Sequence, residues 1–359
     1  MSLAATWRTK FAADRRGRRV AMGCALSAVA GVLWGGRAAL SAEAEVNLYS
    51  YRQEFLIRPL LDAFTEETGI KVNVVFARTG MLERLKAEGE NTPADVVLTV
   101  DIARLQAIAD AGLLQPVKSA VLETNIPAPY RDPSGLWFGL TTRARVIYYA
   151  KDRVDPAELS TYEDLADPKW RGRLCARSGK HAYNRALVAS MIAAHGEAKA
   201  RAWVEGLVAN FARKPQGNDR AQVKALMQGV CDIALGNTYY MGKMKTNDEH
   251  PEQKAWAAAA RIFFPNQDGR GTHVNLSGAG VTKWAKRRAG AIRLIEFLSG
   301  DAAQRLYASQ NFEYPVKDGV AWQAEVASWG RFKADTVGLS RIAELSPAAV
   351  RIINQAGWL

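Results

Sequence analysis

The chain has few of the residues from which zinc and redox centres are built, with three cysteines and four histidines in 359 residues. The histidines, His181, His195, His250 and His273, show no HxxxH or HExxH spacing, so a zinc-hydrolase site has little basis. The GxSxG, P-loop and helix-preceding GxGxxG motifs are missing as well. Acyl-transfer and nucleotide chemistry are therefore unsupported, and we expect a protein that is not an enzyme.

Long apolar runs are scarce too. The apolar stretch 20–34 is too short to span a bilayer of about 30 Å, and it follows a basic block at 15–19. Small residues at 39–44 offer cleavage sites, so we expect residues 1–44 to be a signal peptide for the Sec or the Tat route. Glycines within the stretch weaken the alternative of an uncleaved anchor. The sequence predicts an exported protein that works in the periplasm.

The formal net charge is modest once the leader is set aside. Residues 1–42 contain seven of the 48 basic and one of the 36 acidic residues, so the remaining chain carries +6 rather than +12. No basic stripe interleaved with aromatic residues is present, and we therefore expect no nucleic-acid partner. The remaining positive charge fits either an anionic ligand or ordinary surface composition.

Two cysteines, Cys175 and Cys231, lie beyond the leader. In an oxidising compartment, an isolated pair without a CxxC motif or a suitably spaced histidine is more often a disulfide than a metal site. The bond would close a loop of roughly 55 residues, which the chain-entropy model values at about 4 kcal/mol. Two free buried thiols are the alternative.

Strand-like and helix-like segments alternate along the mature chain, which exceeds the size of a single core. The expected elements are 46–51, 55–68, 72–76, 81–89, 95–99 and 102–111, then 145–149, 173–176, 184–195, 198–210, 222–228 and 230–235, and finally 261–264, 275–281 and 285–298. This order predicts an α/β protein of two lobes, each a mostly parallel sheet flanked by helices, with a hinge between them. We place the N-terminal lobe in 45–141 plus 267–316 and the C-terminal lobe in 142–266 plus 317–359.

The most distinctive feature is the pair Tyr239 and Tyr240 in GNTYYMGKM, with a third candidate, Tyr183, in SGKHAYN. Ionised phenols are hard, anionic oxygen donors, and Fe(III) has the charge to keep them ionised far below their reference pKa of about 10. The three tyrosines are therefore candidate metal ligands. Adjacent tyrosines also occur where one ring is buried and the other exposed, and the residues alone leave that alternative open.

Several segments resemble the bacterial periplasmic ferric-ion-binding proteins of ABC uptake systems, which have the class II periplasmic binding-protein fold. The resemblance runs from residue 45 to about residue 320 and includes VNLYSYRQEFLIRPLLDAFTEETGIKV, WFGLTTRARVIYYAKDRV, SGKHAYN, GNTYYMGKM and FPNQDGRGTHVNLSGAGV. It implies that Tyr183, Tyr239 and Tyr240 bind Fe(III), and that a monomer delivers the ion to an ABC permease in the inner membrane. Gln53 replaces the histidine ligand of other branches. This departure implies the branch that uses three tyrosines with a synergistic anion such as carbonate or bicarbonate.

Three phenolates balance the charge of Fe(III) but fill only three of its six positions, which leaves room for an oxygen-donor anion. Arg143 is the first candidate to hold that anion, because its planar fork matches carbonate. Further candidates for the anion are Arg52, Gln53, Ser178, Gly179 and Lys180. His181, two residues before Tyr183, would face the cleft behind the metal ligands in one reading, but we favour the reading in which it lies in solvent.

Two other functions remain open. A protein of the same fold could bind an organic anion, a polyamine or a sugar, with the tyrosines stacking on the solute. A metal-dependent enzyme is the more distant alternative, since it would need a general base beside an open coordination position and the sequence offers no convincing one.

Overall fold

The structure, a computed structural model, describes residues 45–77 and 79–359; the predicted signal peptide at 1–44 lies outside them. The strands are β1 (Glu45–Ser50), β2 (Lys71–Phe76), β3 (Val96–Thr99), β4 (Phe138–Ala150), β5 (Leu174–Cys175), β6 (Ile233–Asn237), β7 (Ala260–Phe263), β8 (Val274–Val281) and β9 (Tyr314–Pro315). They form one mixed sheet in the order β2, β1, β3, β8, β4, β6, β5, with β7 and β9 also paired to β4.

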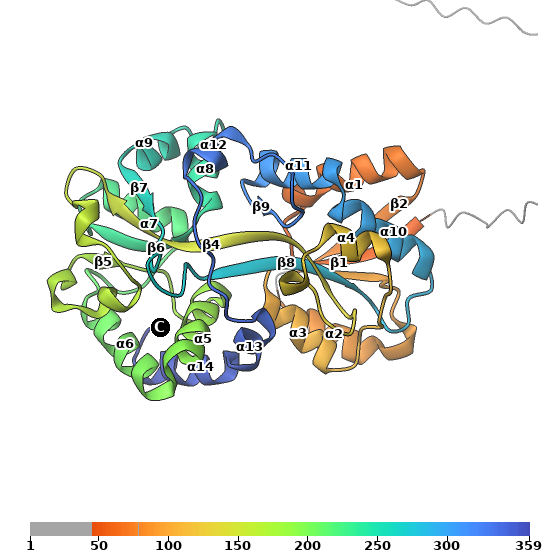
Figure 1. Ribbon diagram of the computed structural model, residues 1–359, viewed down its shortest axis with the longest axis horizontal. Coiled ribbons are helices and arrows are strands. Elements are labelled where there is room, and N and C mark those ends of the chain that lie inside the picture. The colour runs from red at the N-terminus through yellow and green to blue at the C-terminus, as the bar shows by residue number, and fades with distance from the viewer. Residues whose placement is uncertain (1–44, 78) are drawn as a thin grey trace, which may run out of the picture. The chain divides into compact units, whose positions relative to one another are not determined.

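Helices flank this sheet, as the alternation predicted (Figure 1). They are α1 (Glu54–Thr68), α2 (Met81–Glu88), α3 (Ile102–Asp110), α4 (Ala120–Asn125), α5 (Ala182–His195), α6 (Glu197–Ala209), α7 (Asp219–Met227), α8 (Tyr239–Lys245), α9 (Glu252–Ala258), α10 (Arg288–Ser299), α11 (Asp301–Asn311), α12 (Ala324–Ser328), α13 (Leu339–Glu344) and α14 (Ser346–Gln355). Among the described residues, none of these helices combines the length and apolarity needed to cross a membrane.

The first strands and helices follow the sequence closely. In α1, the buried residues Ile57, Leu61 and Phe64 recur at helical spacing and pack into the core. The helix ends at Gly69, whose φ of 73° is the left-handed conformation that glycine adopts without strain. β1 pairs in parallel with β2 and with β3, as expected for strands joined by helices.

The expectation of mostly parallel sheets is wrong for the central strands. β4 carries the chain from the first group of strands to the second, and β8 brings it back, so the two strands run in opposite directions and pair antiparallel. β4 is also antiparallel to β6 and β7. Figure 1 shows β4 and β8 crossing the middle of the molecule. Up to Ala144, β4 pairs with β8; from Arg145 onward it pairs with β6.

The C-terminal segment contacts both groups of elements. Helix α13 packs against α3, which follows β3, and against α5, which follows β5. Leu105 of α3, Leu187 of α5 and Ile342 of α13 belong to one apolar cluster. The two ends of the sheet are thus joined by this helix as well as by β4 and β8.

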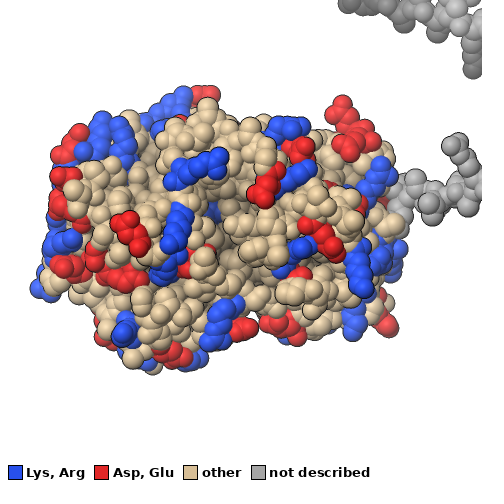
Figure 2. Space-filling model, viewed as in Figure 1, with Lys and Arg blue, Asp and Glu red and all other residues tan. Residues whose placement is uncertain are grey.

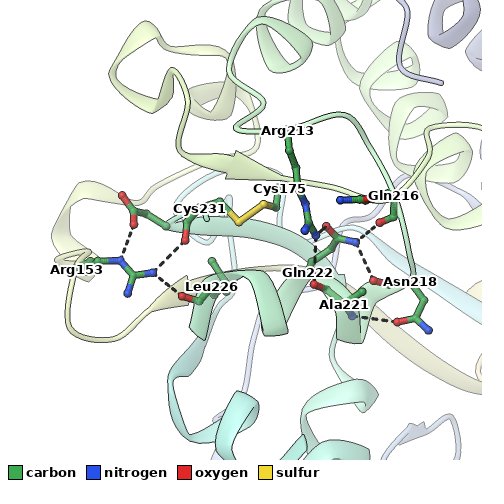
Figure 3. The surroundings of a disulfide bond; sticks show 10 residues. Arg153, Cys175, Arg213, Gln216, Asn218, Ala221, Gln222, Leu226 and Cys231 are labelled. Atoms are coloured by element: carbon green, nitrogen blue, oxygen red, sulfur yellow. Dashed lines mark hydrogen bonds and ion pairs between the residues drawn. A yellow bond between two sulfur atoms is a disulfide. The ribbon is translucent and has the colours of Figure 1, made fainter. Parts of the chain in front are cut away.

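The predicted disulfide between Cys175 and Cys231 is present, with an S–S distance of 2.08 Å and both residues buried (Figure 3). Cys175 ends β5, and Cys231 precedes β6. Beside the bond, the Arg153 guanidinium donates to the carbonyl oxygen of Cys231 at 3.1 Å. The disulfide therefore fixes the spacing between two chain segments that lead to Tyr183 and to Tyr239.

The face shown in Figure 2 carries basic and acidic side chains interspersed over most of its area. On that face, no single sign of charge covers a continuous region of the size that a nucleic-acid backbone would need.

Candidate metal centre

Three tyrosines from two separate helices meet at one place. Tyr183 is the second residue of α5, and Tyr239 and Tyr240 are the first two residues of α8. The hydroxyl oxygens of Tyr183 and Tyr239 are 3.0 Å apart, and the ring centroids of Tyr239 and Tyr240 are 4.3 Å apart. All three side chains are only half-buried, so the cluster of phenols stays accessible to an ion.

Two glycines in the GNTYYMGKM motif explain how α8 is positioned. A Cβ on Gly236 would lie 2.1 Å from the ring of Tyr148, and a Cβ on Gly242 would lie 2.3 Å from the ring of Phe312. Neither ring can give way easily, because both residues are buried. The motif therefore needs glycine before and after the tyrosine pair so that β6 and α8 can pack closely against these aromatic rings.

Tyr183 is held by the start of α5. His181 is the N-cap residue, and its Nδ1 accepts a hydrogen bond from the backbone N–H of Tyr183 at 3.3 Å. The two rings make an edge contact with centroids 4.3 Å apart. The prediction that His181 lies in solvent is wrong, since it is half-buried and caps the helix.

A buried ionic network lies beneath the tyrosines. Asp219 is fully buried and forms ion pairs with Arg145 and, at 2.8 Å, with Arg177. Arg145 also donates to the side-chain oxygens of Asn184 at 2.7 Å and of Asn237 at 3.0 Å. Asn184 follows Tyr183 in α5 and Asn237 ends β6, so the network ties together the two segments that carry the tyrosines.

Arg143 lies two residues before Arg145 on β4 but has different partners. Its guanidinium donates to the backbone oxygen of Val100 and, at 3.4 Å, to the hydroxyl of Ser277, and its carbon lies 5.7 Å from the centroid of the Tyr183 ring. No carboxylate among the described residues forms an ion pair with it, although it is only 2% exposed. A buried positive charge with neutral partners favours an anion beside it.

The other predicted anion-binding residues differ in their surroundings. Arg52 is buried and forms an ion pair with Glu313 at 2.9 Å, so its charge is already compensated. Gly179 is a poor donor to an anion, contrary to the prediction, because its N–H donates to the backbone oxygen of Trp358 at 3.2 Å. Gln53 and Lys180 are exposed, and Ser178 is half-buried.

Burial affects the acid–base state of the site. Burial and, to a lesser extent, the interaction with Tyr183 raise the pKa of both Tyr239 and Tyr240 above the ordinary value for tyrosine. Without a metal, these phenols therefore keep their protons at neutral pH. Burial and the charge of Arg177 lower the pKa of His181 to about 3, so this ring is neutral.

The sequence pointed to the tyrosines and Arg143 but not to Asp219, Arg177 or Asn184. These residues lie in segments that carry the resemblance, yet nothing in their spacing shows that they meet in space. Asp219 lay outside the predicted helix 222–228, and as the first residue of α7 after the cap Asn218 it has the place of an ordinary first-turn acid. No group of three or more His, Cys, Asp and Glu side chains in the described residues is placed to hold a metal ion.

Comparison with known proteins gives consistent results. A family model described as bacterial extracellular solute-binding protein matches residues 49–305. Iron uptake protein A1 of Synechocystis is 53% identical over 315 residues, which cover 88% of this chain and 87% of the relative. The apo ferric ion-binding protein A of Pasteurella haemolytica is 51% identical, with a TM-score of 0.83 over 88% of this chain and 98% of that structure.

A further solved structure shows a related protein with its ligands. A Trichodesmium protein in complex with iron and citrate is 46% identical, with a TM-score of 0.83 over 88% of this chain and 100% of that chain. These similarities confirm the predicted α/β fold of two lobes and the predicted resemblance to ferric-ion-binding proteins.

Proposed function

The chain belongs to the bacterial extracellular solute-binding protein family, and on that premise we propose that it is a periplasmic protein that captures Fe(III) for uptake. Its relatives are iron-binding transport proteins rather than enzymes, and this chain has the same role. The ion is then delivered to an ABC permease in the inner membrane, and the protein acts as a monomer.

The observation that carries this proposal is the meeting of three phenols at one accessible point. Tyr183, Tyr239 and Tyr240 would each lose a proton and bind Fe(III), whose high charge stabilises phenolates that burial alone disfavours. The 3.0 Å separation of the Tyr183 and Tyr239 oxygens suits two ligands on adjacent positions of one ion. The three negative charges of the phenolates would neutralise the three positive charges of Fe(III).

A small oxygen-donor anion would complete the coordination, held by Arg143. The buried guanidinium lacks a carboxylate partner among the described residues and faces the Tyr183 ring, which supports this role. Carbonate or bicarbonate has the geometry for a bidentate contact, and a carboxylate of citrate is an equally suitable donor. The other candidates contribute less: Arg52 is paired with Glu313, Gln53 and Lys180 are exposed, and the Ser178 hydroxyl already accepts a hydrogen bond from the backbone N–H of Lys180.

We place the site between two lobes, 45–141 plus 267–316 and 142–266 plus 317–359. The change of strand partner between Ala144 and Arg145 supports a boundary at this point of β4. Closure of the lobes about β4 and β8 would bring groups from both lobes onto one ion or its anion.

The test is the visible spectrum of the protein after loading with ferric iron. Phenolate bound to Fe(III) gives a charge-transfer band, so the wild type should be coloured and should contain one iron per chain. Replacing Tyr183, Tyr239 or Tyr240 by phenylalanine removes only a hydroxyl and should shift or bleach the band. Tyr149→Phe, on β4 outside the cluster, is the matched control. A colourless wild type that binds an organic solute would favour a binding protein for an organic anion, polyamine or sugar.

A further inference from the structure

A cavity of about 520 Å³ lies outside the tyrosine cluster, and none of the three tyrosines lines it. Its walls come from α8, α9, α12 and β7, together with the residue that follows β4. Helix α9 packs against α8 and β7, and α12 packs against α8, at the upper left of the view in Figure 1. The cavity is large enough for a small organic molecule.

The charged residues that line this cavity are all basic. They are Lys151, Lys245 and Arg261, and no aspartate or glutamate of the described chain lines it. Lys245 forms an ion pair with Glu325 at 2.6 Å. Arg261 donates to backbone oxygens, that of Ala260 at 2.9 Å among them, and within the residues that the structure describes neither Arg261 nor Lys151 has an ion-pair partner. Two uncompensated positive charges beside one cavity raise the local concentration of anions.

The base of the cavity is apolar. Met241, Ala257 and Ala260 are buried there, and Ile262 and Trp329 are half-buried. An apolar group that covers this surface removes it from water, which favours binding. The flexible side chain of methionine can adapt to the shape of such a group. The cavity thus combines an apolar base with basic groups that are exposed to solvent.

The wall that contains Trp329 is held in place by polar contacts. One carboxylate oxygen of Glu325 accepts hydrogen bonds from the indole N–H of Trp329 at 2.9 Å and from the ammonium group of Lys245 at 2.6 Å. The Tyr314 ring makes an edge contact with the Trp329 ring, with centroids 6.4 Å apart. A ligand therefore meets an aromatic surface that is already ordered, which lowers the entropic cost of binding. Because Lys245 is paired, the charges left for a ligand are those on the opposite wall.

We propose that this cavity is a second ligand site, separate from the metal centre, for a small amphipathic monoanion, an apolar body that carries one acidic group. The acidic group contacts Lys151 and Arg261 through charge-assisted hydrogen bonds. The apolar body covers Met241, Ile262 and Trp329. Two unpaired cations suit a single acidic group rather than a polyanion such as a nucleic acid. This inference does not depend on iron binding.

The experiment uses two fluorescent probes that share one apolar body. Anilinonaphthalene sulfonate carries one sulfonate, and phenylnaphthylamine is the same molecule without it. In the double variant Lys151→Gln/Arg261→Gln, affinity for the sulfonate probe should fall at least about tenfold, since two charge-assisted contacts are lost, whereas affinity for the neutral probe should not change. Lys254→Gln, which changes an exposed lysine of α9 outside the cavity lining, is the matched control and should bind both probes like the wild type.

Each outcome decides the proposal. Trp329→Leu removes aromatic surface and should weaken binding of both probes. Equal affinity of the double variant and the wild type for the sulfonate probe overturns the proposal, and so does a parallel loss of both probes in the double variant, which would indicate damage to the apolar base. A wild type that does not bind the sulfonate probe overturns it as well. Lys151 and Arg261 are exposed, so the double variant should fold, and Lys151→Gln alone should show part of the same loss.

Two further measurements separate this site from a membrane surface and from the metal centre. Sedimentation with phosphatidylglycerol vesicles should give the same result for the wild type and the double variant. Vesicle binding that is lost with the two cations would assign the cavity to a lipid surface and overturn the small-ligand site.

Loading with ferric iron should give the wild type and the double variant the same colour, because no tyrosine of the cluster lines the cavity. Loss of colour in the double variant would contradict the separation of the two sites. A wild type that forms no ferric complex would refute the proposed function alone, since the comparison of the two probes needs no iron.

Discussion

Arg143 and Arg145 stand two residues apart on β4 and are each 2% exposed, yet their surroundings are opposite. Arg145 pairs with the carboxylate of Asp219 and is further bound by two asparagine side chains. Arg143 has only a backbone carbonyl and a hydroxyl. One buried charge is compensated within the protein, and the other has no carboxylate partner among the described residues, which is why we propose that an anionic ligand compensates it.

The difference separates scaffold from binding site. A buried ion pair holds its neighbours in one geometry, and breaking it leaves an uncompensated charge. A buried arginine without such a partner costs the protein stability but increases its affinity for an anion. The two arginines lie on either side of the point where β4 changes partner: Arg143 is on the part that pairs with β8, and Arg145 is on the part that pairs with β6.

The largest effect is expected from breaking the scaffold pair. Asp219→Asn leaves Arg145 and Arg177 without their shared carboxylate, and it should lower the free energy of unfolding by about 3–5 kcal/mol. Urea denaturation of the metal-free protein measures this. Asp248→Asn, whose carboxylate is exposed and pairs with Lys254, should leave the stability almost unchanged, because solvent screens this pair. Equal stability of the two variants would contradict the scaffold role.

The next effect concerns the unpaired arginine. Arg143→Ala should weaken iron binding by about 2–4 kcal/mol, on the order of a hundredfold, because the anion loses its bidentate donor. It should also abolish the dependence on added bicarbonate, and the metal-free variant should be no less stable than the wild type. Equal iron binding by the wild type without bicarbonate, citrate or phosphate would show that no synergistic anion is needed.

Iron affinity should also fall as the pH is lowered, over a range in which the stability that the Asp219 ion pairs provide does not change. Tyr239 and Tyr240 have raised pKa values and release protons when they bind iron, so affinity should drop by about tenfold per pH unit for each proton released. Burial alone would raise the pKa of Asp219, but the charges of Arg145 and Arg177 outweigh it and lower that pKa.

The pKa of Asp219 is lower in the folded protein than in the unfolded chain, so protonation of this carboxylate destabilises the fold only at acidic pH. Its stabilising contribution is complete above the unfolded pKa of about 3.9 and disappears as pH falls through the lower folded value. Between pH 5 and 8, competition with a chelator of known affinity should show changing iron binding, while denaturation should show a contribution from this pair that stays constant. Iron affinity that is constant over this range would argue against phenolate ligands.

The smallest effect is expected from Lys243, whose ammonium group already has a hydrogen-bond acceptor within the protein. Lys243, on the helix that carries the tyrosine pair, donates to the backbone oxygen of Gln310 and lies 5.5 Å from the ring of Phe55. Lys243→Met should speed iron release only a few-fold, about 0.5–1 kcal/mol, and leave the bicarbonate dependence intact. A bicarbonate-independent variant would mean that Lys243, rather than Arg143, holds the anion. Stopped-flow iron removal by a chelator measures the rate.

The residues that could be predicted are those with a strong local signal. Helical spacing and Gly69 defined α1, and the tyrosines that the sequence singled out do lie together in the structure. The start of β4 was missed, because its run of glycine and threonines resembles a loop until β8 is known to lie beside it. The mixed direction of the sheet follows from how β4 and β8 cross the molecule, which no local pattern shows.

The site network was out of reach for a related reason. Arg145 and Asp219 are separated by 74 residues, and a pairing between them depends on the whole fold. Gly179 was predicted to bind an anion from its place in a short polar loop, whereas the C-terminal Trp358 packs on it and takes its N–H. Long-range packing decides which polar groups stay free for a ligand.

The most direct test of the central claim is a crystal structure of the iron-loaded protein with anomalous scattering at the iron edge. The account predicts one iron peak at bonding distance from the phenol oxygens of Tyr183, Tyr239 and Tyr240, with an anion between the ion and Arg143. An iron peak elsewhere, or one bonded to none or only one of these tyrosines, would contradict it.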